Sequence, residues 1–328
     1  SISGGQFYAA DIVRSHDVPA TAVYEHLALE DIRRAATELH PVYEATRGRD
    51  GYASLEVSPH LAHDTEHTLQ EARRLWAALD QPNAMIKVPA TPAGMAAMET
   101  LIAEGINVNV TLLFAVDAYR RVTDAWLRGL ERRLAAGGEL SQVASVASFF
   151  ISRIDTAADV EIDRRLAAGV PNRDGRTMSA LRGTLAIANA RQAYLHYMET
   201  VTQPRWRRLA SAGAQPQRLL WASTGVKDPA YRDVRYIEEL IGSETVNTVP
   251  PATLDAFREH GVPRDSLLED LDGALDRLSE AARLGVDLAA ITDTLLADGL
   301  RQFREAHDRL IDAIEQTQRA HHRALQHA

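Results

Sequence analysis

Lysine is the rarest charged residue of this sequence, and its two positions are the first candidates for chemistry. Of the 36 basic residues, 34 are arginine and 2 are lysine, Lys87 and Lys227. Arginine serves as well as lysine on a surface or in an ion pair, but its guanidinium does not lose its proton. A retained lysine therefore favours a site that needs a neutral amine, and chance retention of two ordinary lysines is the alternative.

Lys87 lies inside the apolar run AMIKVP, between Ile86 and Val88. Desolvation at such a position lowers the pKa of an amine, and the neutral amine can attack a carbonyl to form a Schiff base. A structural ion pair with Glu56 is the competing interpretation. Pairing and catalysis are compatible, because a buried carboxylate needs a partner in either case.

Other polar residues also interrupt apolar, strand-like segments. Glu56 and Thr111 form a candidate pair for holding a water that relays protons during Schiff-base chemistry. The positions that we select in these segments are Glu56, Lys87, Asn109, Thr111, residues 148–153 and Ser223.

A second group of side chains has the chemistry of a phosphate site. Arg153, Ser223 and Lys227 offer guanidinium, hydroxyl and ammonium donors, all of which favour a dianion. The competing roles are structural: an ion pair of Arg153 with Asp155 or Asp159, an ion pair of Lys227 with Asp228, and a turn cap by Ser223.

Strands and helices that alternate along the chain must position these residues. Period-two or continuously apolar segments predict strands at residues 52–57, 84–89, 106–114, 143–154, 218–223 and 245–249. Amphipathic patterns predict helices at residues 20–46 (interrupted or reshaped by Pro41), 61–79, 92–103, 117–136, 177–201 and from 265 to the end. Such alternation indicates a parallel sheet, either a closed barrel or an open doubly wound sheet. In a barrel the active site lies at the carboxyl ends of the strands, where the polar residues above occur.

Composition limits the class of protein. With 328 residues, 45% hydrophobic and 25% charged, the chain is typical of a globular protein, here one domain over residues 1–328 with a C-terminal helix and tail over 301–328. The net charge of -9 argues against nucleic acid and anionic membranes as partners. The longest apolar runs, such as residues 142–151, are too short to span a bilayer, so we expect a cytoplasmic protein.

Metal and thiol chemistry have little support in the sequence. The absence of cysteine excludes disulfides, thiolate catalysis and cysteine-rich metal sites. We expect His60 and His63 to face solvent on a helix, and His321, His322 and His327 to lie in a frayed tail, rather than to bind a metal.

Six segments of the sequence together resemble the transaldolase family, in particular its longer actinobacterial and cyanobacterial form. They are GYASLEVSPHLAHDT, NAMIKVPATPAG, EGINVNVTLLF, ASVASFFISRIDT, PQRLLWASTGVKDP and ETVNTVPPAT. The resemblance covers nearly the whole chain. It implies an α/β fold of the TIM (β/α)₈ barrel, class I aldolase type, with about six of the eight strands visible here.

The resemblance also implies an activity that needs no metal or organic cofactor. Transaldolases move a dihydroxyacetone unit between sugar phosphates, from sedoheptulose 7-phosphate to glyceraldehyde 3-phosphate, giving erythrose 4-phosphate and fructose 6-phosphate in the pentose phosphate pathway. The matching positions are Lys87 for the Schiff-base lysine, Glu56 and Thr111 for the water-holding pair, Asn109 and Ser148 for contacts to the dihydroxyacetone unit, Arg153 and Ser223 for phosphate, and Lys227 in place of a second phosphate arginine.

One departure from the family concerns the beginning of the sequence. Family members start with two further strands, which carry an Asp general acid/base and a T-x-N-P motif, and neither is found here. Residues 1–6 resemble the segment that follows T-x-N-P, so we expect a missing beginning, and without the Asp a steep fall in activity. The alternatives are a fructose 6-phosphate aldolase-like enzyme, whose members are much shorter, and a non-catalytic sugar-phosphate-binding barrel. The sequence leaves the oligomeric state open.

Overall fold

The computed structural model describes residues 6–15 and 17–326, and within them six strands form one parallel sheet. Each strand pairs with the next along the chain, in the order β1-β2-β3-β4-β5-β6. The strands are β1 Ala53–Glu56, β2 Ala84–Pro89, β3 Val108–Leu113, β4 Ser145–Phe150, β5 Arg218–Ala222 and β6 Thr245–Asn247. In the described part of the chain β1 and β6 are the two edges of the sheet, and no strand precedes β1.

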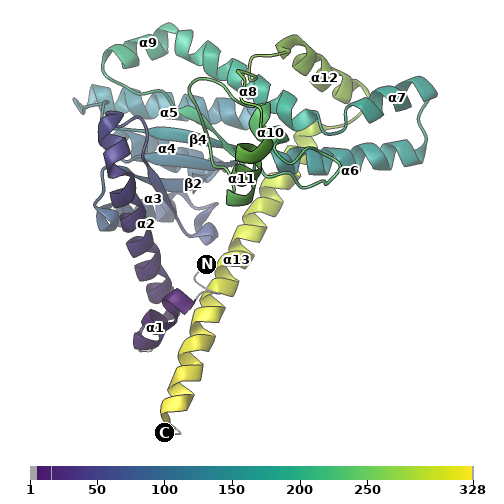
Figure 1. Ribbon diagram of the computed structural model, residues 1–328. Coiled ribbons are helices and arrows are strands. Elements are labelled where there is room, and N and C mark those ends of the chain that lie inside the picture. Colours follow the sequence, from purple (N-terminus) through teal and green to yellow (C-terminus); the bar gives the residue numbers. More distant parts are fainter. Residues whose placement is uncertain (1–5, 16, 327–328) are drawn as a thin grey trace.

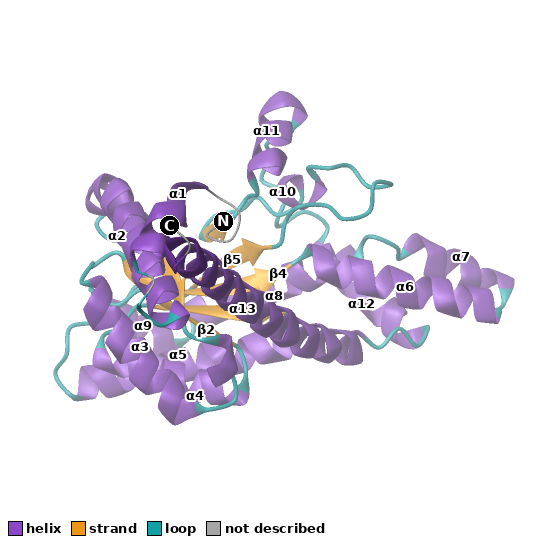
Figure 2. Cartoon of the chain, turned by 90° about the horizontal axis from the view of Figure 1, so that it is seen from below, coloured by secondary structure: helices purple, strands orange, loops and turns teal. Residues whose placement is uncertain are grey.

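Helices connect the strands and cover the sheet. They are α1 Gln6–Arg14, α2 Ala20–Ala45, the short 3₁₀ helix η1 Pro59–Leu61, α3 Thr65–Leu79, α4 Pro92–Glu104, α5 Val116–Ala135, α6 Ser152–Ala168, α7 Asn172–Ala180, α8 Leu185–Thr202, α9 Pro204–Ser211, α10 Arg235–Glu238, α11 Pro251–His260, α12 Leu271–Arg283 and α13 Leu288–Gln326. Figure 2 shows α3, α4 and α5 together along one side of the sheet. The strands β3 and β4 are buried along their whole length, which explains their nearly continuous apolar sequence.

The helix predicted at residues 177–201 is two helices, and that prediction was wrong. α7 ends at Ala180 and α8 begins at Leu185, with Gly183 in the left-handed region at φ +64°. Two carboxylates of α6 bind the backbone of this break: Asp159 accepts from Gly183 N at 2.9 Å, and Asp155 accepts from Ala186 N at 2.7 Å. These tertiary hydrogen bonds replace helical ones, and the local sequence does not reveal them.

Two further boundaries differ from the prediction. The strand predicted to reach residue 154 ends at Phe150, and the chain turns into α6 at Ser152. Pro41 lies inside α2, which continues through it to Ala45, so the expected interruption was wrong. Proline removes one helical hydrogen bond, and the remaining contacts of α2 keep the helix whole.

The last helix, α13, runs past the sheet to α1 and α2 (Figure 1). Its Ile314, 1% exposed, packs in a small apolar cluster with Ile12, Val23 and Leu27. Gln318 of the same helix donates from Nε2 to the carbonyls of Ser15 and Val18, at 2.8 and 2.9 Å. His321 and His322 lie near the end of α13, whereas His327 is outside the described residues.

None of the helices in residues 6–15 and 17–326 is long and apolar enough to cross a membrane.

Candidate active site

Three polar side chains stand in a row across the first three strands. Strand pairing sets Glu56 beside Lys87 and Lys87 beside Asn109. Lys87 Nζ lies 3.5 Å from Glu56 Oε2, and each side chain is 25% exposed. The structure thus contains the Lys87–Glu56 ion pair that was one interpretation of the sequence, and both side chains are partly accessible to solvent.

Two opposing effects act on the pKa of the Glu56 carboxyl. Burial raises its pKa above the usual range, and the Lys87 ammonium opposes part of that rise. A glutamate with a raised pKa holds and releases protons closer to neutral pH, as a general acid or base must.

An aromatic ring from the far end of the chain completes the surroundings of the lysine. The Phe303 ring of α13 has its centre 6.0 Å from Lys87 Nζ. Phe303 also lines a cavity of about 380 Å³ together with Glu56, Tyr24 and His307. The sequence analysis missed Phe303, because an apolar residue in a long amphipathic helix carries no local sign of such a contact.

Asn109 and Ser148, buried in neighbouring strands, are joined by a hydrogen bond. Ser148 Oγ donates to Asn109 Oδ1 at 2.7 Å, and Asn109 Nδ2 donates to Ser54 Oγ at 3.2 Å. Lys87, Asn109 and Ser54 line a second cavity, of about 400 Å³, inside the sheet. The second cavity is therefore lined by the amine of Lys87, the amide of Asn109 and the hydroxyl of Ser54.

Thr111 is fully buried, and its hydroxyl has no hydrogen-bond partner within the described residues. It pairs with Pro89 at the end of β2, just before an irregular stretch of β3 in which Leu112 adopts φ +59°. A buried hydroxyl without a partner costs about 1–3 kcal/mol. Thr111 is not among the residues that line the two cavities described above.

Arg153 and Ser223 lie just beyond neighbouring strands: Ser223 follows β5, and Arg153 lies in the first turn of α6 rather than in the strand predicted for it. Ser152 N donates to the Ser223 carbonyl at 3.1 Å, and the two serine hydroxyls are 3.0 Å apart. Arg153 donates to Gln302 Oε1 at 3.1 Å and stands over the Phe150 ring. The competing ion pairs of Arg153 are not formed in the described structure, where Asp155 and Asp159 instead accept hydrogen bonds from Tyr236 and Tyr231.

Lys227 is exposed and lies beyond β5, over Gly225. Lys227 Nζ and Thr253 Oγ1 both lie close to Gly225, at 3.8 and 3.4 Å from the point that a Cβ atom would occupy there. Asp228 does not pair with it in the described structure, because its Oδ1 accepts from Ala230 N at 2.9 Å. Lys227 is thus not brought into the row that contains Lys87.

The two histidines set aside in the sequence analysis, His60 and His63, are exposed as expected, with His60 on η1 rather than on an α-helix.

Comparison with known proteins decides the family. The family described as Transaldolase/Fructose-6-phosphate aldolase matches residues 1–314. The chain belongs to this family. A transaldolase of Parafrankia sp. (strain EAN1pec) is 48% identical over 96% of this chain and 84% of its own, and one of Thiobacillus denitrificans is 47% identical over 94% and 84%. Transaldolase 2 of Nostoc sp. (strain PCC 7120) is 45% identical over 96% and 84%.

Family membership confirms the resemblance and the prediction of a transferase enzyme. It also agrees with the fold, since the parallel sheet in strict sequential order is the arrangement expected of part of a (β/α)₈ barrel. Because the curated relatives carry the name transaldolase, transaldolase is supported over the fructose 6-phosphate aldolase alternative.

Proposed function

We propose that this enzyme transfers a dihydroxyacetone unit between ketose and aldose phosphates through a Schiff base on Lys87. The observation that carries the proposal is the pair of Lys87 Nζ and Glu56 Oε2, 3.5 Å apart in a partly buried row of polar residues. An amine beside a carboxyl of raised pKa can add to a carbonyl while the carboxyl moves the protons.

The steps follow from the groups present. The Lys87 amine attacks the ketose carbonyl, and water leaves the carbinolamine to give an iminium. Glu56, through the water that it holds with Thr111, takes the proton of the hydroxyl on C4. The C3–C4 bond then breaks, its electron pair enters the iminium to give an enamine, and the C4 fragment departs as an aldose phosphate. The remaining enamine attacks the aldehyde carbon of the acceptor, and water finally releases the new ketose.

The other residues have supporting roles in this proposal. Glu56 and Thr111 hold the water that relays protons, and Asn109 and Ser148 bind the dihydroxyacetone unit. Arg153 and Ser223 bind the phosphate, and Lys227 contributes from the far side of β5. No metal or organic cofactor takes part in these steps. We further propose that the substrates are those of the pentose phosphate pathway and that the enzyme acts in the cytoplasm.

Borohydride reduction in the presence of fructose 6-phosphate tests the Schiff base. The chain has only two lysines, so a reduced adduct on a side-chain amine must lie at Lys87 or Lys227. Intact mass and peptide mapping should locate it on Lys87, and Lys87→Met should abolish it and lower turnover by roughly 10⁴-fold or more. Lys227→Arg is the matched control and keeps the adduct.

An adduct that persists in Lys87→Met would refute the assignment of the nucleophile. The same assay separates transfer from cleavage: release of glyceraldehyde 3-phosphate from fructose 6-phosphate beyond one equivalent per enzyme should require erythrose 4-phosphate. Free dihydroxyacetone formed without an acceptor would favour the aldolase activity instead.

A further inference from the structure

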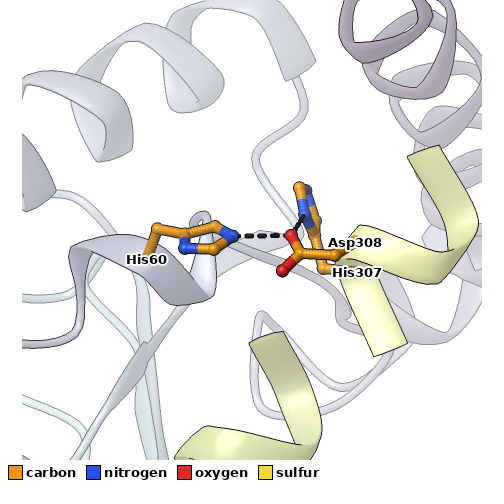
Figure 3. A group of neighbouring side chains, drawn as sticks. All are labelled: His60, His307 and Asp308. Atoms are coloured by element: carbon orange, nitrogen blue, oxygen red, sulfur yellow. Dashed lines mark hydrogen bonds and ion pairs between the residues drawn. The ribbon is translucent and has the colours of Figure 1, made fainter. Parts of the chain in front are cut away.

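Three possible metal ligands meet where α13 passes η1, outside the row that contains Lys87. They are His60 of η1 and the adjacent residues His307 and Asp308 of α13 (Figure 3). His60 Nε2 lies 2.7 Å from Asp308 Oδ1, and His307 Nδ1 lies 3.5 Å from the same oxygen. One ligand atom from each residue lies within 4.8 Å of the other two.

His307 supplies a second observation. Its Nδ1 is buried and faces the Asp308 carboxylate, the group with which it also makes its ion-pair contact. The edge-to-face contacts with Tyr24 and His60, at 5.4 and 5.7 Å between ring centres, hold the ring in this orientation. A neutral imidazole that presents the lone pair of Nδ1 to this site can bind a metal ion together with the carboxylate.

Two of the three distances between these atoms can be compared with those of a tetrahedral centre. Metal–ligand distances of about 2.0–2.2 Å place tetrahedral ligand atoms roughly 3.3–3.6 Å apart. The contact of His307 with Asp308 already has this length. The contact of His60 with Asp308 must open by about 0.6–0.9 Å, which two side chains that are 49% and 54% exposed can accommodate.

We propose that His60, His307 and Asp308 bind a divalent transition-metal ion, with zinc as the representative. Two imidazoles and one carboxylate suit zinc, cobalt or nickel, and a purely oxygen-seeking ion such as magnesium would not use the histidines. Water fills the remaining position. Binding fixes η1 to α13 beside the cavity that Glu56 and Phe303 also line.

Titration of the purified, untagged chain with Zn²⁺ tests the proposal. The histidines near the C-terminus are a competing source of binding, so the titrations are repeated in a variant with His321, His322 and His327 changed to Gln. We expect one equivalent of Zn²⁺ to bind with similar affinity in both chains and to raise their Tm, with reversal by a chelator. Co²⁺ in the same site should show the visible absorption of a tetrahedral complex.

Variants of the ligands must weaken this binding. In the tail variant, His60→Ala and Asp308→Asn should each lower Zn²⁺ affinity on the order of 100-fold, and the substituted side chains are exposed enough to leave the fold intact. His63→Ala, at an exposed histidine three residues further along, is the matched control and should bind as before. Zn²⁺ affinity that is lost with the tail histidines, or is unchanged in both His60→Ala and Asp308→Asn, would overturn the site.

Discussion

The row of Glu56, Lys87 and Asn109 depends on backbone pairing, since neighbouring parallel strands set the three residues side by side. All three could be selected from the sequence because each is a polar residue inside an apolar strand. The contacts of Asn109 with Ser54 and of Lys87 with Phe303 could not be predicted from the sequence. Phe303 is more than 200 residues away from Lys87 along the chain, and no periodic pattern reports a contact over that separation.

The unpartnered hydroxyl of Thr111 leads to a prediction with opposite effects on stability and activity. Thr111→Val keeps the shape of the side chain and removes the hydroxyl, so the free energy of unfolding should rise by about 1 kcal/mol. If the hydroxyl holds the water that relays protons, turnover should fall by about 10²-fold. Steady-state kinetics and denaturant unfolding measure the two effects. Thr123→Val, at a buried threonine of α5, should leave turnover unchanged, and wild-type turnover in Thr111→Val would exclude the proposed role.

At the scale of elements, the group formed by α6, α7, α8 and α12 has its own apolar cluster, which includes Ile162, Met178, Leu185 and Ala281. Figure 2 shows α6, α7 and α12 projecting together away from the sheet. Buried Asp155 of α6 joins α8 and α10, because it accepts hydrogen bonds from Ala186 N of α8 and from the Tyr236 hydroxyl of α10 at 2.7 and 2.8 Å.

Asp155 should make the stability of the protein depend on pH. Burial raises its pKa from 3.8 to about 6, against the effect of its hydrogen bonds. The folded state therefore binds the proton more tightly than the unfolded state. The stability that protonated Asp155 contributes is complete below about pH 4 and is lost as pH rises through about 6, by about 3 kcal/mol.

Denaturant unfolding between pH 4 and 7 checks this prediction. Asp155→Asn cannot ionise, so the difference in unfolding free energy between wild type and Asp155→Asn should change across this window. Asp163→Asn is the control on the same helix, at a side chain that is 52% exposed. Parallel pH profiles of wild type and Asp155→Asn would contradict the prediction.

Most elements of this fold could be predicted from the sequence, because turn residues separate apolar runs of strand length from amphipathic runs of helix length. The residues predicted for β2, 84–89, agree with the structure at both ends. The failures have a common cause. At the break between α7 and α8, hydrogen bonds from Asp155 and Asp159 decide where helices end, and these partners come from another helix.

At the scale of the whole molecule, α13 connects the sheet with the apolar cluster of α1 and α2. Along its length Gly299 lies close to Leu112 of β3, Phe303 faces Lys87, and Ile314 packs against α1 and α2. Its 39 residues correspond to about 58 Å of helix. The packing at Ile314 is therefore remote from the core of the sheet.

Truncation of Ile314 should loosen one end of the molecule and leave the sheet intact. Ile314→Ala removes a side chain that is 1% exposed, at an expected cost of about 2–5 kcal/mol to the packing around it. Hydrogen exchange should become faster in α1, in the first turns of α2 and in the last turns of α13, with β2 and β3 unchanged. Leu268→Ala, at a side chain 45% exposed, is the control. Equal loss of protection in β2 and β3 would show that Ile314 supports the whole fold.

The unbroken course of α13 also bears on how this protein tolerates mutation. A helix is stiff along its axis, and Phe303 and Ile314 are 11 residues apart on the same rod. Because one continuous helix carries both side chains, we expect a shift of α1 or α2 against Ile314 to displace the Phe303 ring beside Lys87. Substitutions in α1 and α2 are then expected to change turnover and to come under selection, although neither helix contains a reacting group.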